Sequence, residues 1–102
     1  MEYEGLSGEE RSGYPHLFAP FERDRLRLRN RVVHVSMTTR YVVDGRVTEP
    51  LIRYFENRAL GGAAMIVSEP VNATRFQARP QYVRASTDEQ LDGLKRWAEA
   101  VE

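Results

Sequence analysis

Cysteine is absent from the 102 residues, which excludes disulfides, thiolate metal ligands and a cysteine nucleophile. Long apolar runs are also missing, since no stretch approaches the ~18 residues that a membrane-spanning helix needs. Neither sign of charge is in excess, because 15 basic residues balance 15 acidic ones. The composition therefore predicts no membrane partner and no nucleic-acid partner.

Residues 1–13 are acidic, contain Gly and Ser, and lack the apolar segment of a secretory signal. We interpret them as a disordered tail and expect a cytoplasmic protein. Hydrophobic residues make up 41% of the chain and charged residues 29%, which is ordinary for a small globular unit. A single folded unit is therefore expected over residues 14–102.

The stretch from Asn30 to Tyr41 is the most informative part of the sequence. Val32 to Ser36 is short, apolar and rich in β-branched residues, which predicts a buried strand. It changes abruptly to Ser, Met, two Thr and Arg. Ligands of parallel sheets bind beyond the carboxyl ends of the strands, so residues 36–41 are predicted to form the rim of a binding site.

A helix is predicted to begin after Thr48 and to end at Gly61-Gly62, because threonine is a good N-cap and glycine a good C-terminal stop. The intervening apolar stripe consists of Leu51, Ile52, Phe55, Ala59 and Leu60. Asp44-Gly45, before this helix, is a turn dipeptide. Residues 63–68 then predict a second strand, apolar at successive positions as in a strand covered on both faces.

This second strand also ends in a polar break, at residues 68–70, so strand, helix and strand form a βαβ unit. Capping boxes at Ser86 and Thr87 predict a second amphipathic helix, with Trp97 on its apolar stripe. The connection from Val71 to Ala85 shows little periodicity, and no third strand is predicted. A substrate-side loop and a plain surface loop are both open interpretations of it.

Strand, helix, strand and helix in this order predict an α/β fold. Two parallel strands leave one sheet face and both edges uncovered when helices pack only on the other face. We therefore expect the opening portion of a (β/α)8 TIM barrel, a fold of ~250 residues, incomplete at this length. Either a C-terminal barrel portion is missing from the sequence, or copies of the chain associate as a homo-oligomer.

Two features have both a structural and a functional interpretation. His34, alone in its strand, is interpreted as a packed, hydrogen-bonded residue rather than a metal ligand. Arginine occupies every odd position from Arg23 to Arg31, and Leu26 and Leu28 alternate with it. This alternation predicts a strand or hairpin with the arginines on one solvated face, and a phosphate-binding ribbon is the alternative.

Several short motifs share their spacing with one known family. They are Leu17-Phe18-x-Pro20, Asn30-Arg31, Ser36-Met37-Thr38-Thr39-Arg40-Tyr41, Asp44-Gly45, Arg58-Ala59-x-Gly61-Gly62, Ile66-Val67-Ser68-Glu69 and Asp88-Glu89-Gln90-Leu91. Through them, residues 17–102 resemble the Old Yellow Enzyme family of flavin-dependent NAD(P)H oxidoreductases. That family includes the ene-reductases and the amino-terminal part of the dienoyl-CoA reductases.

The resemblance implies a TIM barrel that holds FMN at the carboxyl ends of its strands, with NAD(P)H as the reductant. Ser36, Met37 and Thr38 would contact the flavin, although many members have Pro where this chain has Ser36. The Thr38 hydroxyl would lie near a ring carbonyl, where a hydrogen bond strengthens as negative charge develops. Pro70 would approach the pyrimidine side of the ring.

Arg40 or Tyr41 would face a small-molecule substrate. The family's other flavin-binding and proton-donating residues correspond to positions beyond Glu102, so no catalytic residue is assigned within the chain. The expected function is that of an FMN-dependent NAD(P)H oxidoreductase of the ene-reductase or dienoyl-CoA reductase type, with this chain as the first wall of the flavin pocket. The alternative is a non-catalytic barrel fragment that acts as an assembly or interaction piece.

Overall fold

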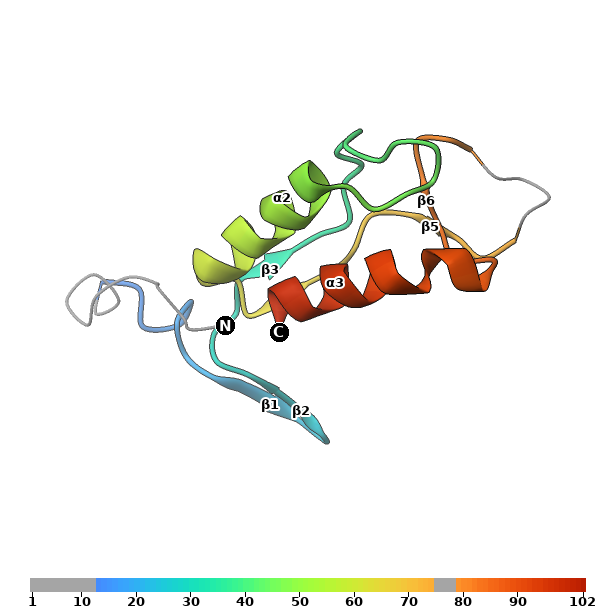
Figure 1. Cartoon of the computed structure of the whole chain (residues 1–102). Helices are drawn as coiled ribbons and strands as arrows, with labels where there is room; N and C mark the ends of the chain where they lie inside the picture. Colours follow the sequence, from blue (N-terminus) through green and yellow to red (C-terminus); the bar gives the residue numbers. More distant parts are fainter. Residues whose placement is uncertain (1–12, 75–78) are drawn as a thin grey trace.

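A computed structural model describes residues 13–74 and 79–102 (Figure 1). The predicted tail lies outside these ranges except for Gly13, as do positions 75–78 of the connection that follows the second strand. The elements are β1 (Phe21–Arg23), β2 (Leu26–Leu28), β3 (Val33–His34), α2 (Glu49–Leu60), β4 (Met65–Ile66), β5 (Val71–Asn72), β6 (Val83–Arg84), the 3-10 helix η1 (Asp88–Gln90) and α3 (Leu91–Val101). None of the helices in the described part is long and apolar enough to cross a bilayer.

The predicted βαβ unit is confirmed. Strands β3 and β4 pair in parallel, with Val33 opposite Met65, and α2 connects them. Both strands are shorter than predicted, two residues each in place of residues 32–36 and 63–68. Among the described residues each is hydrogen-bonded only to the other, so no second neighbour extends the ladder on either side.

Helix α2 begins and ends where its sequence predicts. Thr48 is the N-cap, and its Oγ1 accepts a hydrogen bond from the Leu51 N–H at 3.3 Å, which satisfies one of the free amides of the first turn. Pro50 lies in that turn, where its missing N–H costs nothing. At the other end the chain reverses at Gly62, whose φ of 108° is poorly accessible to other residues.

The core lies between the two helices, which run side by side in Figure 1. Phe55 of α2 is 1% exposed, and its ring lies edge-on to Trp97 of α3 with the centroids 5.2 Å apart. The buried hydrophobic residues are Val42, Leu51, Ile52, Phe55, Ala59, Val83 and Trp97. Trp97 is therefore part of the core, as its place on the helical stripe predicts.

The prediction of no third strand is wrong. β5 and β6 pair in parallel within the connection of residues 71–85, with Val71 opposite Val83. Val83 is fully buried in the core. Strands of two residues are too short to show an alternating pattern, and their pairing depends on contacts across the chain, so no local signal announced them.

The Asp44-Gly45 turn is hydrogen-bonded to the segment that contains β6. Asp44 and Gly45 both have positive φ, 49° and 74°, as a type I′ turn requires. The Gly45 N–H donates to the Pro80 carbonyl at 3.0 Å, and the Arg84 N–H donates to the Gly45 carbonyl at 2.9 Å. The predicted turn is confirmed, and it fixes the position of β6.

β1 and β2 form an antiparallel hairpin that projects away from the helices (Figure 1). The prediction of a strand or hairpin is confirmed, but the placement of all five odd-numbered arginines on one face is wrong. Arg25 lies in the hairpin turn, after Asp24 with its φ of 53°. Arg29 donates to the carbonyls of Ala59 (3.5 Å) and Ala63 (3.3 Å), which attaches the hairpin to the end of α2.

One face of the β3–β4 pair is uncovered, as predicted. Its apolar side chains are exposed to between 40% and 62%: Val33, Val35, Met65 and Val67. The residues between them point the other way, and Ile66 packs against the helical core. This alternation places the helices on one side of the sheet and leaves the other side open.

Candidate functional site

The candidate site lies at the carboxyl ends of β3 and β4, where the two chain segments that follow the strands remain side by side. Val33 pairs with Met65, 32 residues further along the chain. The Ser36 hydroxyl donates to the Ser68 carbonyl at 2.8 Å, and these two residues are also 32 apart. The last backbone hydrogen bond between the segments runs from the Val67 N–H to the His34 carbonyl, and the Ser36 side chain keeps them adjacent as far as Ser68.

The register changes at the next contact between the segments. The Thr39 hydroxyl donates to Oε1 of Glu69 at 2.7 Å, and these residues are only 30 apart. The first segment thus uses two more residues than the second to cover the same span. Met37 and Thr38 are those two residues. We call these two residues the bulge: they lie beyond the ends of the paired strands, and Met37 is 55% exposed and Thr38 is also exposed.

A strained turn follows the bulge. The oxygen of the Thr39 hydroxyl accepts a hydrogen bond from the Tyr41 N–H at 3.2 Å. Arg40, between them, has a φ of 66°, in the left-handed region that costs a non-glycine residue about 1–2 kcal/mol. Hydrogen bonds worth about 1 kcal/mol each are of the right size to offset that cost. The turn is also attached to α2, because the Thr48 hydroxyl donates to the Tyr41 carbonyl.

The structure places the predicted site residues on two adjoining segments. Residues 36–41 and 68–70 are held together by the Ser36–Ser68 and Thr39–Glu69 hydrogen bonds. Pro70, like Arg40, is exposed, and Tyr41 is 47% exposed. The hydroxyl of Thr38 has no hydrogen-bond partner among the described residues. The rim therefore offers a free hydroxyl, the apolar side chain of Met37 and a proline that lacks an N–H.

Two residues of this site were missed from the sequence. Thr39 and Glu69 stand inside the quoted motifs, but neither was assigned a role. Glu69 is 1% exposed, whereas a glutamate beside a proline at a strand end is normally solvated. The signal that could have identified it is the polar break itself, because the side chain directly after a buried strand can still point into the protein.

His34 is packed and hydrogen-bonded, as its structural interpretation predicts. Its Nε2 lies 3.1 Å from the Tyr54 hydroxyl, and its ring contacts Tyr54 and Phe55 edge-on. Nδ1 is buried with no partner among the described residues. In the part of the chain that the structure describes, no group of three His, Asp or Glu side chains comes together as metal ligands.

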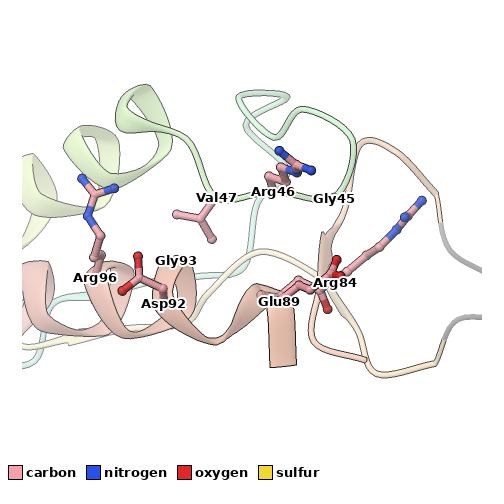
Figure 2. Close-up of a pocket in the computed structure, with 9 residues that line it drawn as sticks. Gly45, Arg46, Val47, Arg84, Glu89, Asp92, Gly93 and Arg96 are labelled. Carbon is pink, nitrogen blue, oxygen red and sulfur yellow. The ribbon is translucent and has the colours of Figure 1, made fainter. Parts of the chain in front are cut away.

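A cleft of about 550 Å³ lies away from this rim, between the Asp44-Gly45 turn and the start of α3 (Figure 2). Its charged lining residues are of both signs: Arg46, Arg84, Arg96, Glu89 and Asp92. Arg96 also forms a salt bridge with Glu49, and the hydrogen bond within this pair raises the pKa of Arg96. The mixture of charges gives this cleft no preference for an anionic or a cationic ligand.

Three comparisons relate the chain to known proteins. The model of the NADH:flavin oxidoreductase / NADH oxidase family matches residues 16–102. A metal reductase from Desulforamulus reducens is 35% identical over 86 residues, which are 84% of this chain and 13% of that protein. An NADH oxidase from Thermoanaerobacter brockii is 34% identical over 91 residues, which are 86% of this chain and 14% of that protein.

Solved structures with a similar fold include an old yellow enzyme. The old yellow enzyme from Trypanosoma cruzi matches with a TM-score of 0.72 and 25% identity, covering 87% of this chain and 24% of that one. The predicted resemblance and the predicted incomplete TIM barrel are thereby confirmed. The chain spans 13–14% of the length of the curated relatives described above.

Proposed function

Because this chain belongs to the NADH:flavin oxidoreductase / NADH oxidase family, we propose that its strand-end rim is one wall of an FMN site in an NAD(P)H-dependent oxidoreductase. FMN and NAD(P)H are the cofactors of this family. Bound FMN supplies the capacity to accept and donate hydride. The observation that carries the proposal is the two-residue bulge at the ends of β3 and β4, since ligands of such sheets bind at that edge.

The residues of the rim fit a planar ring with a polar edge. Thr38 has a hydroxyl that is not used within the chain, so it can donate to a carbonyl of the ring. Met37 offers a polarizable apolar side chain for the ring face. Pro70 allows close approach from β4 without presenting an N–H. Ser36, whose hydroxyl is engaged with Ser68, orients the backbone of the bulge.

Arg40 and Tyr41 form the substrate side of the proposed site. Both are exposed, and the Thr39 and Thr48 hydroxyls hold their backbone. A guanidinium and a phenol beside the flavin suit a small polar acceptor, such as an activated alkene conjugated to a carbonyl. We therefore assign the acceptor class of the ene-reductases or dienoyl-CoA reductases, and keep the cytoplasmic location as a prediction.

The test is a hybrid protein, here called the hybrid, in which residues 16–102 replace the matching segment of the Thermoanaerobacter brockii NADH oxidase. We expect the purified hybrid to bind FMN and to oxidise NADH. Thr38→Val should weaken FMN binding about fivefold, as loss of one hydrogen bond predicts, and Thr38→Ser should restore it. A folded hybrid that stays colourless after reconstitution with FMN refutes the proposal.

The uncovered face of β3 and β4 favours a second candidate function, that of a non-catalytic assembly piece. The exposed side chains of Val33, Val35, Met65 and Val67 have to be covered for a stable sheet. Sedimentation of the 102-residue chain tests this function. Stable self-association that Val35→Lys abolishes supports it, whereas a compact monomer with a cooperative melt counts against it.

A further inference from the structure

Glu69 is a buried carboxylate at the centre of the rim. It is 1% exposed, and it stands between the end of β4 and Pro70. Asn30 is the other buried polar side chain in the described part of the chain. An ionised carboxylate loses much of its hydration on burial and is tolerated only where neighbouring groups compensate. The local environment of Glu69 therefore requires an explanation.

The two oxygens of Glu69 have different surroundings. Oε1 accepts the Thr39 hydroxyl hydrogen at 2.7 Å. Oε2 is buried and has no hydrogen-bond partner among residues 13–74 and 79–102. A buried acceptor without a partner destabilises the folded state, so stability alone does not account for this carboxylate. The one side-chain hydrogen bond that the carboxylate makes among the residues that the structure describes, from the Thr39 hydroxyl, identifies the group that it can position.

Thr39 links Glu69 to the turn that carries Arg40 and Tyr41. A threonine hydroxyl has one hydrogen to donate, and that hydrogen is directed at Glu69, which leaves a lone pair for the Tyr41 N–H. The two hydrogen bonds therefore orient each other. Arg40 lies inside the loop that they close, in its left-handed conformation. Without Glu69 the hydroxyl is free to rotate, and the turn loses its hydrogen bond to the segment that follows β4.

We propose that Glu69 is a positioning residue, which acts through Thr39 to hold the turn of residues 39–41 in the conformation that presents Arg40 and Tyr41 to the substrate. This inference rests on the function proposed above. Its effect falls on the substrate side and not on the flavin, because the chain of hydrogen bonds from Glu69 runs through Thr39 to the Tyr41 N–H and includes neither Thr38 nor Pro70.

Hydrogen exchange in the 102-residue chain tests the coupling without any cofactor. In Glu69→Ala, the Tyr41 amide should exchange about fivefold faster, since its acceptor is no longer oriented. Glu69→Gln retains an oxygen acceptor and should restore the exchange rate of the unmodified chain. Equal exchange in the unmodified chain and Glu69→Ala overturns the proposal, and so does an unprotected Tyr41 amide in both.

Kinetics of the hybrid test the role of the turn. We expect Glu69→Ala and Thr39→Val each to raise KM for the acceptor about fivefold, with FMN affinity unchanged within about twofold. The double variant should have a KM no higher than that of either single variant, because both substitutions remove the same hydrogen bond between Glu69 and Thr39. Glu99→Ala, an exposed glutamate of α3, is the matched control and should change neither quantity.

The outcomes separate this inference from the proposed function. A hybrid that binds no FMN refutes the flavin site, while the exchange experiment still decides the Glu69–Thr39 link. A hybrid that binds FMN but loses it on Glu69→Ala overturns the inference, because Glu69 then supports the flavin and not the substrate-side turn. Additive effects of Glu69→Ala and Thr39→Val on KM also overturn it.

Discussion

Replacing Phe55 by alanine is expected to remove most of the stability of the chain. Phe55 lies on the buried face of α2 and is 1% exposed. Its ring centroid is 5.2 Å from that of Trp97 in α3 and 5.8 Å from that of His34 in β3. One side chain thus joins both helices to the strand that carries the candidate site.

The magnitude follows from the packing. Truncating a buried phenylalanine to alanine costs about 3–5 kcal/mol, and the edge-on contacts with Trp97 and His34 favour the upper part of that range. A domain of this size has a free energy of unfolding of about 5–15 kcal/mol. With an apolar sheet face exposed, this chain belongs at the lower end, so Phe55→Ala should leave it barely folded.

Urea unfolding monitored by fluorescence measures the effect, because Trp97 is the single tryptophan and lies against Phe55. With a slope of about 1–3 kcal/mol per molar urea, the midpoint should fall by more than about 1 M. Tyr14→Ala is the control, since Tyr14 is 61% exposed and its loss should cost less than about 0.5 kcal/mol. Equal midpoints for the two variants would show that α2 and α3 do not pack through Phe55.

Two further predictions use the same urea assay. Thr48→Ala should lower the free energy of unfolding by about 1 kcal/mol, because it removes the N-cap acceptor for the Leu51 N–H and the donor to the Tyr41 carbonyl. Thr48→Ser keeps the hydroxyl and should unfold near the midpoint of the unmodified chain. An unchanged midpoint for Thr48→Ala contradicts the cap. Gly45→Ala should lower the free energy of unfolding by about 1–2 kcal/mol, because φ is 74° and a Cβ there would lie 2.6 Å from the Arg84 side chain. If the double variant Gly45→Ala/Arg84→Ala recovers the full loss, the clash with Arg84 and not the backbone strain is responsible.

The parts of this fold that were predictable are those set by neighbouring residues. Helix α2 shows its cap at Thr48, its apolar stripe and its glycine stop within a single stretch, and all three are observed. The type I′ turn at Asp44-Gly45 depends on the conformational preferences of two residues. Signals of this kind do not need the rest of the chain, so they can be read before the fold is known.

The parts that failed depend on contacts between distant residues. Strands β5 and β6 exist because Val71 and Val83 come together, and two-residue strands carry no pattern of their own. The five arginines were assigned to one face because their period of two continues through the hairpin turn, where Asp24 turns the chain with a positive φ. The buried Glu69 side chain accepts a hydrogen bond from Thr39, 30 residues away. The rim was predictable as a location, but its internal hydrogen bonds were not.

The bulge at the rim can be tested by deletion, because strand geometry has a period of two. Removing both Met37 and Thr38 lets Thr39 follow Ser36 in the register of β3 and β4 and keeps every later side chain on its own face. The shortened chain should therefore unfold within about 1 kcal/mol of the unmodified chain, since shortening a loop by two residues changes its closure entropy little. In the hybrid it should no longer bind FMN.

Removing Met37 alone is the matched control. A deletion of one residue shifts the period by one, turns Thr39 away from Glu69 and removes the hydrogen bond that Oε1 of the buried carboxylate accepts, so that both of its oxygens are without a partner. The single deletion should unfold at a clearly lower urea concentration than the double deletion, although it removes one residue and the double deletion removes two. If the double deletion is the less stable of the two, Met37 and Thr38 are part of the strand pairing, and the flavin site would have to lie elsewhere.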